Sequence, residues 1–233
     1  MNAQNRFCGW YDCDLTSRGE QEATDAARLL QIDTVSSLSS IDVIYTSRLL
    51  RAQKSAEIIR DELGLDSRVE IREDWRLNEQ MYGALTGLNK KETILRFGFN
   101  QVHKWRRSWD RAPPPYPDKC WSGYFPSQGH PDSPKYEDCS VFDVPDTWRG
   151  GGGTESLEDT QIRAWQFWEE RVVPDMAAGQ RVLLVAHGNV MRALIKKLDS
   201  IAVDEIKHVT IPRCTPLLYR FDRDLKVCAE SPS

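Results

Sequence analysis

The sequence predicts an α/β fold, a single three-layer domain in which helices flank a mostly parallel sheet. Its clearest unit begins with the apolar run from Val182 to Ala186, which is typical of a short strand buried on both faces of a parallel sheet. His187, Gly188 and Asn189 come next. One face of a helix follows, formed by Met191, Leu194, Ile195 and Leu198. Because strands alternate with helices along the chain, we expect one α/β domain with a parallel sheet over residues 1–233.

The N-terminal half predicts two helices and two short strands. Ser17 and Glu20 have the spacing of a capping box, ahead of a helix whose apolar residues are Ala23, Ala26, Ala27 and Leu30. Residues 42–45 predict a strand, and Thr46 and Ser47 offer N-cap chemistry for a second helix. That helix has Ala52, Ala56, Ile59 and Leu63 on one side and ends at Leu63-Gly64. Residues 69–71 predict another short strand, and residues 74–88 a loop.

The C-terminal half is less regular. One helix is predicted from about 90 to 107, and a second after the capping pair Ser156 and Asp159, with Ile162, Trp165 and Trp168 on its apolar face. Between them, from about 112 to 153, prolines and a four-glycine run break any long element. This insertion is long enough for a lid or binding loop, but for its second half we favour a disordered surface segment. Residues 210–212 and 217–221 close the chain with strand-like runs.

Composition excludes several classes of protein. The chain has 31 Lys and Arg against 35 Asp and Glu, a formal charge of −4, which argues against nucleic acid as its main partner. Its longest fully apolar run is far too short to span a membrane, and the N-terminus lacks the apolar core of a signal peptide. None of the six cysteines has C-x-x-C spacing, so we expect no metal site and reduced thiols in the cytoplasm.

Several polar residues sit where predicted strands give way to helices or loops. His187 lies at the carboxyl end of a strand beside a helix N-terminus, where free N–H groups favour anions. A histidine hydrogen-bonded into a turn explains His187 equally well. Other candidates are Arg51, Glu79, Tyr82, Lys90, Arg106 and Arg107. Each of them alone also fits an ordinary structural role on a helix face or in a surface ion pair.

Seven segments give the chain a resemblance to a known family. They are residues 5–12, 45–52, 77–85, 87–93, 105–107, 154–157 and 186–189. In their order and content they resemble the cofactor-dependent phosphoglycerate mutases of the histidine phosphatase superfamily. The resemblance covers nearly the whole chain outside about 117–153. It favours the functional interpretation of the candidate residues over the structural one.

The resemblance implies a phosphoryl transfer. In such enzymes 2,3-bisphosphoglycerate, the cofactor, phosphorylates a histidine that then exchanges its phosphoryl group with 3- or 2-phosphoglycerate, without a metal. Arg51 and a protonated His187 would flank the phosphoryl group, and Glu79 would act as general acid and base. The residues expected to bind the anionic substrate are Cys8, Gly9, Tyr82, Lys90, Arg106, Arg107, Gly188 and Asn189. The family also implies a homodimer or homotetramer.

One part of the family pattern is absent from the sequence. The 233 residues contain no Arg-His-Gly, the motif that carries the nucleophilic histidine at the end of a first strand inside the sheet. We therefore expect a fold with that strand missing and a chain that is inactive as given. Because the missing strand would leave unpaired edges in the sheet, we favour a truncated gene model of an active mutase over a catalytically dead protein that binds phosphoglycerates or a partner. A bisphosphoglycerate mutase or phosphatase is a close variant, whereas an unrelated α/β domain requires seven coincidental matches.

Overall fold

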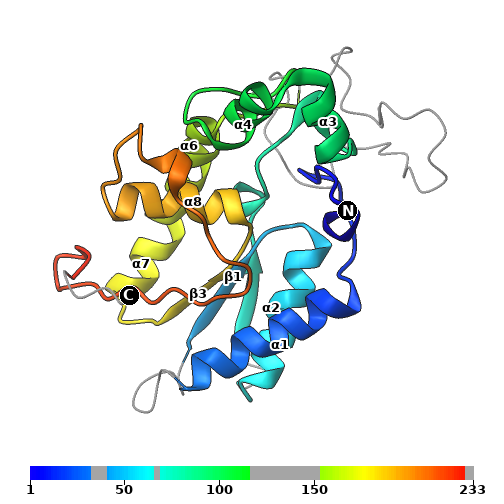
Figure 1. The fold of residues 1–233 in the computed structure, drawn as a ribbon. Coiled ribbons are helices and arrows are strands. Elements are labelled where there is room, and N and C mark those ends of the chain that lie inside the picture. The colour runs from blue at the N-terminus through cyan, green and yellow to red at the C-terminus, as the bar shows by residue number, and fades with distance from the viewer. Residues whose placement is uncertain (33–40, 66–68, 116–152, 229–233) are drawn as a thin grey trace.

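The computed structural model describes residues 1–32, 41–65, 69–115 and 153–228 (Figure 1). Three strands form one parallel sheet in the order β2-β1-β3. They are β1 (Val43–Thr46), β2 (Glu70–Glu73) and β3 (Val182–Val185). Val43 of β1 pairs with Glu70 on one side and with Val182 on the other. The predicted α/β fold with a parallel sheet is confirmed.

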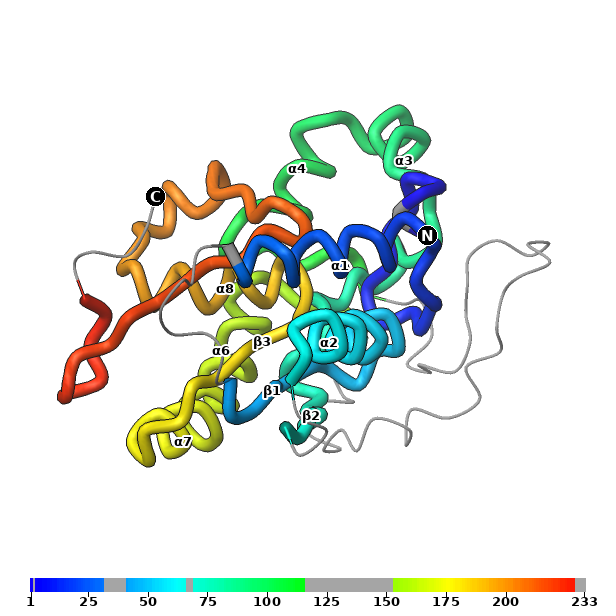
Figure 2. The backbone as a smooth tube through the Cα atoms, turned by 90° about the horizontal axis from the view of Figure 1, so that it is seen from below, coloured from blue at the N-terminus to red at the C-terminus, as the bar shows by residue number. Residues whose placement is uncertain are grey.

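Helices cover both faces of this sheet (Figures 1 and 2). On one face lie α1 (Ser17–Ile32) and α2 (Leu50–Glu62), and on the other α6 (Leu157–Phe167), α7 (Val173–Ala177) and α8 (Gly188–Leu198). Strand side chains alternate between the two faces, so that Ile44 packs toward α2 whereas Val43 and Tyr45 pack toward α6 and α8. The molecule therefore has the three layers that the sequence predicts.

The helix termini show where capping was predicted correctly and where it was not. Ser156 and Asp159 form the predicted capping box of α6, with both reciprocal hydrogen bonds. At α1, by contrast, the hydroxyl of Thr16 accepts from the N–H of Gly19, so the cap lies one residue before Ser17. At α2 the N–H of Leu50 donates to the carboxylate of Asp12, 2.7 Å away. A side chain distant in sequence thus takes the capping role expected of Thr46 and Ser47, and Ser47 Oγ accepts instead from Leu49 N, before the first helical residue.

The predicted helix over 90–107 is two helices. Asn89 caps α3 (Lys90–Phe97), which stops at Gly98, and α4 (Phe99–Arg107) starts directly after it. Gly98 has a φ of +81°, a conformation that breaks the helical path and that glycine adopts without a steric penalty. The break turns α4 relative to α3, and both lie beyond the carboxyl ends of the strands (Figure 1).

Short helical turns make up much of the remaining structure. They are the 3₁₀ turns η1 (Asn2–Gln4), η2 (Trp75–Leu77), η3 (Gly83–Leu85) and η6 (Ile206–His208), and the π-helical turn η5 (Trp168–Val172) that joins α6 to α7. On α6 the predicted face is partly wrong, because Ile162 is exposed, whereas Arg163 and Phe167 are buried instead. None of the helices in the described ranges is long and apolar enough to cross a bilayer.

The third strand is less buried than its sequence predicts. All four residues of β3 are half-buried, whereas all four residues of β1 are buried. The reason is that β1 has a strand on each side, while β3 pairs only with β1 among the described residues. The strand-like runs 210–212 and 217–221 are also wrong as strands, since within the described C-terminal region only the bridge Phe221–Val227 forms. Most of the 112–153 insertion lies outside the described residues.

Gly83 lies where the chain around the insertion returns to the body of the protein. Its N–H donates to Gly153 O, and the next N–H donates to Pro114 O. Its φ is +49°, and a β-carbon there would lie 2.2 Å from Pro114 O. Only a residue without a β-carbon fits this position.

We expect Gly83→Ala to lower the free energy of unfolding in urea by about 3 kcal/mol or more, through left-handed strain plus the clash. Gly64→Ala is the matched control, because Gly64 has a φ of +63° but no atom within 4 Å of the added carbon. Its loss should be only about 1 kcal/mol. Equal losses in the two variants would show that the contact with Pro114 is unimportant.

Candidate active site

The site forms where two neighbouring strands end. His187 follows β3 and occupies the N-cap position of α8, and Ser47 follows β1. Because parallel neighbours end at the same edge of a sheet, the two side chains meet, with 2.8 Å between Ser47 Oγ and His187 Nε2. Only 8% of the surface of His187 is exposed. The histidine thus lies at the strand edge that the sequence predicts, held by a serine expected only to cap a helix.

The surroundings of His187 keep its imidazole neutral. Burial lowers the pKa of His187 well below its ordinary value, and the positive charges of Arg51 and Arg163 lower it further. The expectation of a protonated His187 concerns the site with a bound phosphoryl group, and it stays a prediction. A bound anion would offset these charges and favour the protonated form.

Arg51 joins the N-terminal loop to the first turn of α2. Its guanidinium donates to Tyr11 O and to Gly9 O, each at 2.8 Å. Gly9 has a φ of +56° and packs against the backbone around Tyr82. Cys8, the residue before it, is half-buried. The predicted residues Cys8, Gly9 and Arg51 are therefore brought together by backbone contacts of one loop.

Glu79 and Tyr82 both approach the start of α8. The carboxylate of Glu79 accepts from its neighbour Gln80 N at 2.8 Å. Burial raises the pKa of Glu79, although hydrogen bonds from Gln80 and Asn189 and the charge of Arg51 oppose the rise. The Asn189 side chain donates to the hydroxyl of Tyr82 at 2.8 Å, and burial raises the pKa of Tyr82 to about 12. A carboxyl with a raised pKa suits proton transfer near neutral pH.

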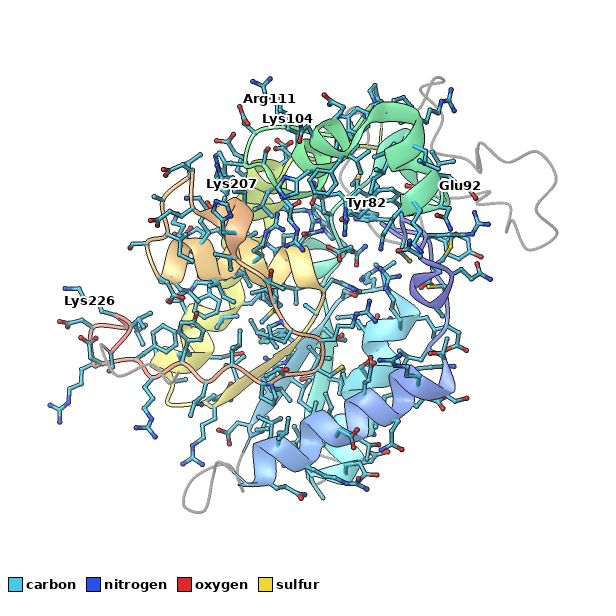
Figure 3. The ribbon with its side chains drawn as sticks, viewed as in Figure 1. Tyr82, Glu92, Lys104, Arg111, Lys207 and Lys226 are labelled. Atoms are coloured by element: carbon cyan, nitrogen blue, oxygen red, sulfur yellow. The ribbon has the colours of Figure 1, made fainter. Side chains whose placement is uncertain are left out.

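A group of cations lies beside Tyr82. Lys90 and Arg106 both approach the ring of Phe7, at 5.8 and 5.9 Å from its centre. Arg107 donates to Val209 O at 3.2 Å. Burial lowers the pKa of Lys90, and the nearby charge of Arg106 lowers it further. Figure 3 shows Tyr82 between α3 and α4 on one side and the sheet on the other, whereas Lys104 and Arg111 lie at the periphery. The predicted anion-binding residues Lys90, Arg106 and Arg107 therefore lie together, because they are carried by the neighbouring helices α3 and α4.

One cation of this group was not predicted. Arg192 on α8 is 2% exposed, and its guanidinium donates to Arg106 O at 3.3 Å. Burial lowers the pKa of Arg192 to about 10, and the charge of Arg107 contributes to the shift. Its Nε has no hydrogen-bond partner within the part of the chain that the structure describes. Arg192 falls among the apolar residues of the predicted α8 face, so helical periodicity alone does not distinguish it.

A buried ion pair supports the segment that carries Glu79 and Tyr82. Arg163 on α6 is fully buried and forms two hydrogen bonds to Glu155, at 2.7 and 2.9 Å. It also donates to Arg76 O at 2.6 Å and to Glu79 O at 3.1 Å. Glu155 in turn accepts from the N–H of Met81 at 3.0 Å. This pair, which the sequence did not reveal, fixes the backbone on both sides of Glu79.

Comparison with known proteins shows the family to which the chain belongs. The model of the histidine phosphatase superfamily (branch 1) matches residues 1–123 and 120–230. The 2,3-bisphosphoglycerate-dependent phosphoglycerate mutase of Nitratidesulfovibrio vulgaris is 41% identical over 228 residues, covering 98% of this chain and 84% of that protein. The enzyme of the same name from Zymomonas mobilis is also 41% identical, covering 96% and 89%. The chain therefore belongs to the histidine phosphatase superfamily, in the family of the 2,3-bisphosphoglycerate-dependent phosphoglycerate mutases.

Solved structures share the fold. YhfR of Bacillus stearothermophilus has a TM-score of 0.65 and 20% identity, covering 99% of this chain and 89% of its own. A mycobacterial glucosyl-3-phosphoglycerate phosphatase has a TM-score of 0.63 and 21% identity, covering 97% and 91%. At these identities the likeness concerns the architecture alone.

We expect Arg163→Met to lower the free energy of unfolding in urea by about 3–5 kcal/mol, because it leaves the charge of Glu155 buried and unpaired. Adding Glu155→Leu should recover much of that loss. Arg18→Met is the control, since Arg18 and Glu22 form an exposed pair on α1 whose loss should cost less than about 1 kcal/mol. Additive losses in the double variant would mean that the two side chains do not act as a pair.

The neutral His187 makes stability depend on pH. Its pKa is lower in the folded protein than in the unfolded chain, where it is about 6.5. The unfolded chain therefore binds a proton first, and the free energy of unfolding falls as the pH drops below about 6.5. We expect His187→Asn to lose this part of the pH dependence between about pH 6.5 and 5, measured by urea unfolding at each pH. If the free energy of unfolding changes equally with pH in the unaltered protein and in His187→Asn, His187 is not a buried neutral histidine.

Proposed function

We propose that these residues form the site of a cytoplasmic mutase that interconverts 3-phosphoglycerate and 2-phosphoglycerate through a phosphohistidine primed by 2,3-bisphosphoglycerate, and that the histidine to be phosphorylated is not among these 233 residues. Two adjoining parts of the site carry the proposal. The first is the group of His187, Arg51 and Glu79. The second is the group of cations, and the hydrogen bond between Asn189 and Tyr82 joins the two parts. Such an arrangement suits a small molecule with a phosphoryl group at one end and a second anionic group at the other.

Each residue of the first part has a definite role in this proposal. Arg51 and His187 flank the transferring phosphoryl group, whose oxygens accept bonds from the guanidinium and from the imidazole once it is protonated. Glu79 exchanges a proton with the substrate hydroxyl, for which its raised pKa is suited. Gly188 and Asn189 offer backbone N–H groups at the start of α8. No metal takes part in these steps.

The cations bind the rest of the substrate. Lys90, Arg106 and Arg107 neutralise its remaining phosphate or carboxylate, while Cys8 and Gly9 contact it from the N-terminal loop. The names of the family members support the mutase over a phosphatase or a bisphosphoglycerate mutase. Relative rates on 3-phosphoglycerate and on 2,3-bisphosphoglycerate distinguish the three activities.

The proposal gives His187 a supporting role rather than that of nucleophile. Its Nε2 is occupied by Ser47, and no Arg-His-Gly occurs in the 233 residues. We therefore propose that these 233 residues bind phosphoglycerates without forming phosphohistidine. The alternative of a phosphoglycerate-binding protein without catalysis has the same binding site, so the binding and the chemistry need separate tests.

We expect the 233-residue chain to bind 2,3-bisphosphoglycerate in calorimetry, and Arg106→Ala to weaken that binding about ten- to hundredfold through loss of a charge-assisted contact. Lys104→Ala is the matched control, because Lys104 lies on the same helix but is exposed at the periphery (Figure 3). It should change the affinity less than about twofold. Equal effects of the two variants would indicate unspecific attraction of an anion.

The chemistry is tested by acid-labile phosphate on the purified chain after incubation with 2,3-bisphosphoglycerate. We expect none on the 233 residues. If acid-labile phosphate appears and His187→Asn removes it, His187 is itself the nucleophile and the supporting role is wrong.

A further inference from the structure

Two cysteines of the N-terminal loop lie side by side next to the site. The distance between Cys8 Sγ and Cys13 Sγ is 3.5 Å. Two tight turns bring them together, because Tyr11 N donates to Cys8 O and Cys13 N donates to Tyr11 O, each at 3.1 Å. A disulfide needs a sulfur–sulfur distance of about 2.05 Å, so the two atoms have to approach by only about 1.5 Å. The loop already holds the sulfurs close to bonding distance.

The two thiols are chemically different. The hydrogen bond between the two sulfurs lowers the pKa of Cys13, and the charge of Arg51 lowers it further. The same hydrogen bond and burial raise the pKa of Cys8. Cys13 is therefore the thiol that loses its proton more readily, and the thiolate is the reactive form of a cysteine. A reactive cysteine beside a second thiol is the arrangement found where an oxidised cysteine is resolved to a disulfide.

We propose that Cys8 and Cys13 form a reversible disulfide when the protein meets hydrogen peroxide. The Cys13 thiolate attacks one peroxide oxygen and breaks the O–O bond, which gives a sulfenic acid and a hydroxide that takes up a proton. Cys8 sulfur then attacks the Cys13 sulfur and breaks its S–O bond, and the departing hydroxide leaves as water with the proton of Cys8. Two thiols lose two electrons and two protons in total, and the peroxide becomes two waters. A dithiol such as dithiothreitol reverses the reaction.

The disulfide acts on the site through the loop that contains it. Gly9 O and Tyr11 O, the two acceptors of Arg51, both lie between the cysteines. Oxidation also removes the thiol hydrogen of Cys8, which bonds to Tyr11 O at 3.5 Å. Since both changes disturb the support of Arg51, we expect the oxidised chain to bind 2,3-bisphosphoglycerate about three- to tenfold more weakly. This consequence rests on the proposed function, whereas the disulfide does not.

The disulfide is tested on the full 233-residue chain. It is treated with hydrogen peroxide, alkylated, digested with chymotrypsin, which cleaves after Trp10 or Tyr11 between the two cysteines, and mapped by mass spectrometry. We expect a linked pair of peptides carrying Cys8 and Cys13, with Cys214 and Cys228 alkylated, and full alkylation after dithiothreitol. Cys13→Ser should abolish the linked pair, and Cys214→Ser, the matched control, should leave it unchanged. Alkylation of both Cys8 and Cys13 after oxidation, or pairing of either with another cysteine, overturns the proposal.

The effect on binding is measured by calorimetry with 2,3-bisphosphoglycerate before oxidation, after it, and after reduction. We expect weaker binding by the oxidised protein, recovery with dithiothreitol and no response to peroxide in Cys13→Ser. If the linked pair forms but the affinity stays the same, the control of the site is overturned. If the reduced protein does not bind 2,3-bisphosphoglycerate, the proposed function fails, and peptide mapping still decides whether the disulfide forms.

Discussion

The buried pair of Arg163 and Glu155 is the interaction on which the site depends. Arg163 reaches the carbonyls of Arg76 and Glu79, and Glu155 holds the N–H of Met81. A buried guanidinium has no water around it, so its N–H groups need acceptors within the protein. The carboxylate of Glu155 accepts from some of them, and the backbone carbonyls of this segment accept from others. The segment consequently has one conformation, in which the Glu79 carboxyl faces Arg51 and α8. The same constraint therefore serves both packing and the placement of a proton-transfer group.

The rest of the site follows from the order of the strands. Adjacent β1 and β3 bring Ser47 beside His187, and α2 and α8, which start directly after these strands, bring Arg51 and Asn189. Lys90, Arg106 and Arg107 arrive from outside the three layers, on α3 and α4, and Arg192 joins them from α8. The kink at Gly98 sets the direction of α4 and with it the position of Arg106 and Arg107. A rigid layered body thus supplies the reactive groups, and a separate helical pair supplies the charge that holds a substrate.

Residues with strong local patterns were predicted well. The apolar run before His187 and the capping box at Ser156 specify their elements without help from distant residues. Features that depend on distant partners were not predictable in this way. Asp12 caps α2 from 38 residues away, and Arg163 meets the carbonyl of Arg76 across 87 residues. Ser47 was predicted to cap a helix because a serine hydroxyl has the same hydrogen-bonding chemistry at a helix N-terminus as beside a histidine. Arg192 sits within an apolar face, where periodicity predicts only burial.

The pairing of β1 with β3 also determines when the protein can complete its fold. The two strands are separated by 139 residues, as the bond from Thr46 to Val185 shows. At about 5–20 residues per second, a ribosome needs roughly 7 to 28 s to make that length of chain. During this interval β1 has one edge without its partner, and the apolar side chains that later face α6 and α8 stay uncovered. Nascent chains of this protein therefore pass through a period in which this apolar surface is exposed, and His187 joins the site only after β3 has been made.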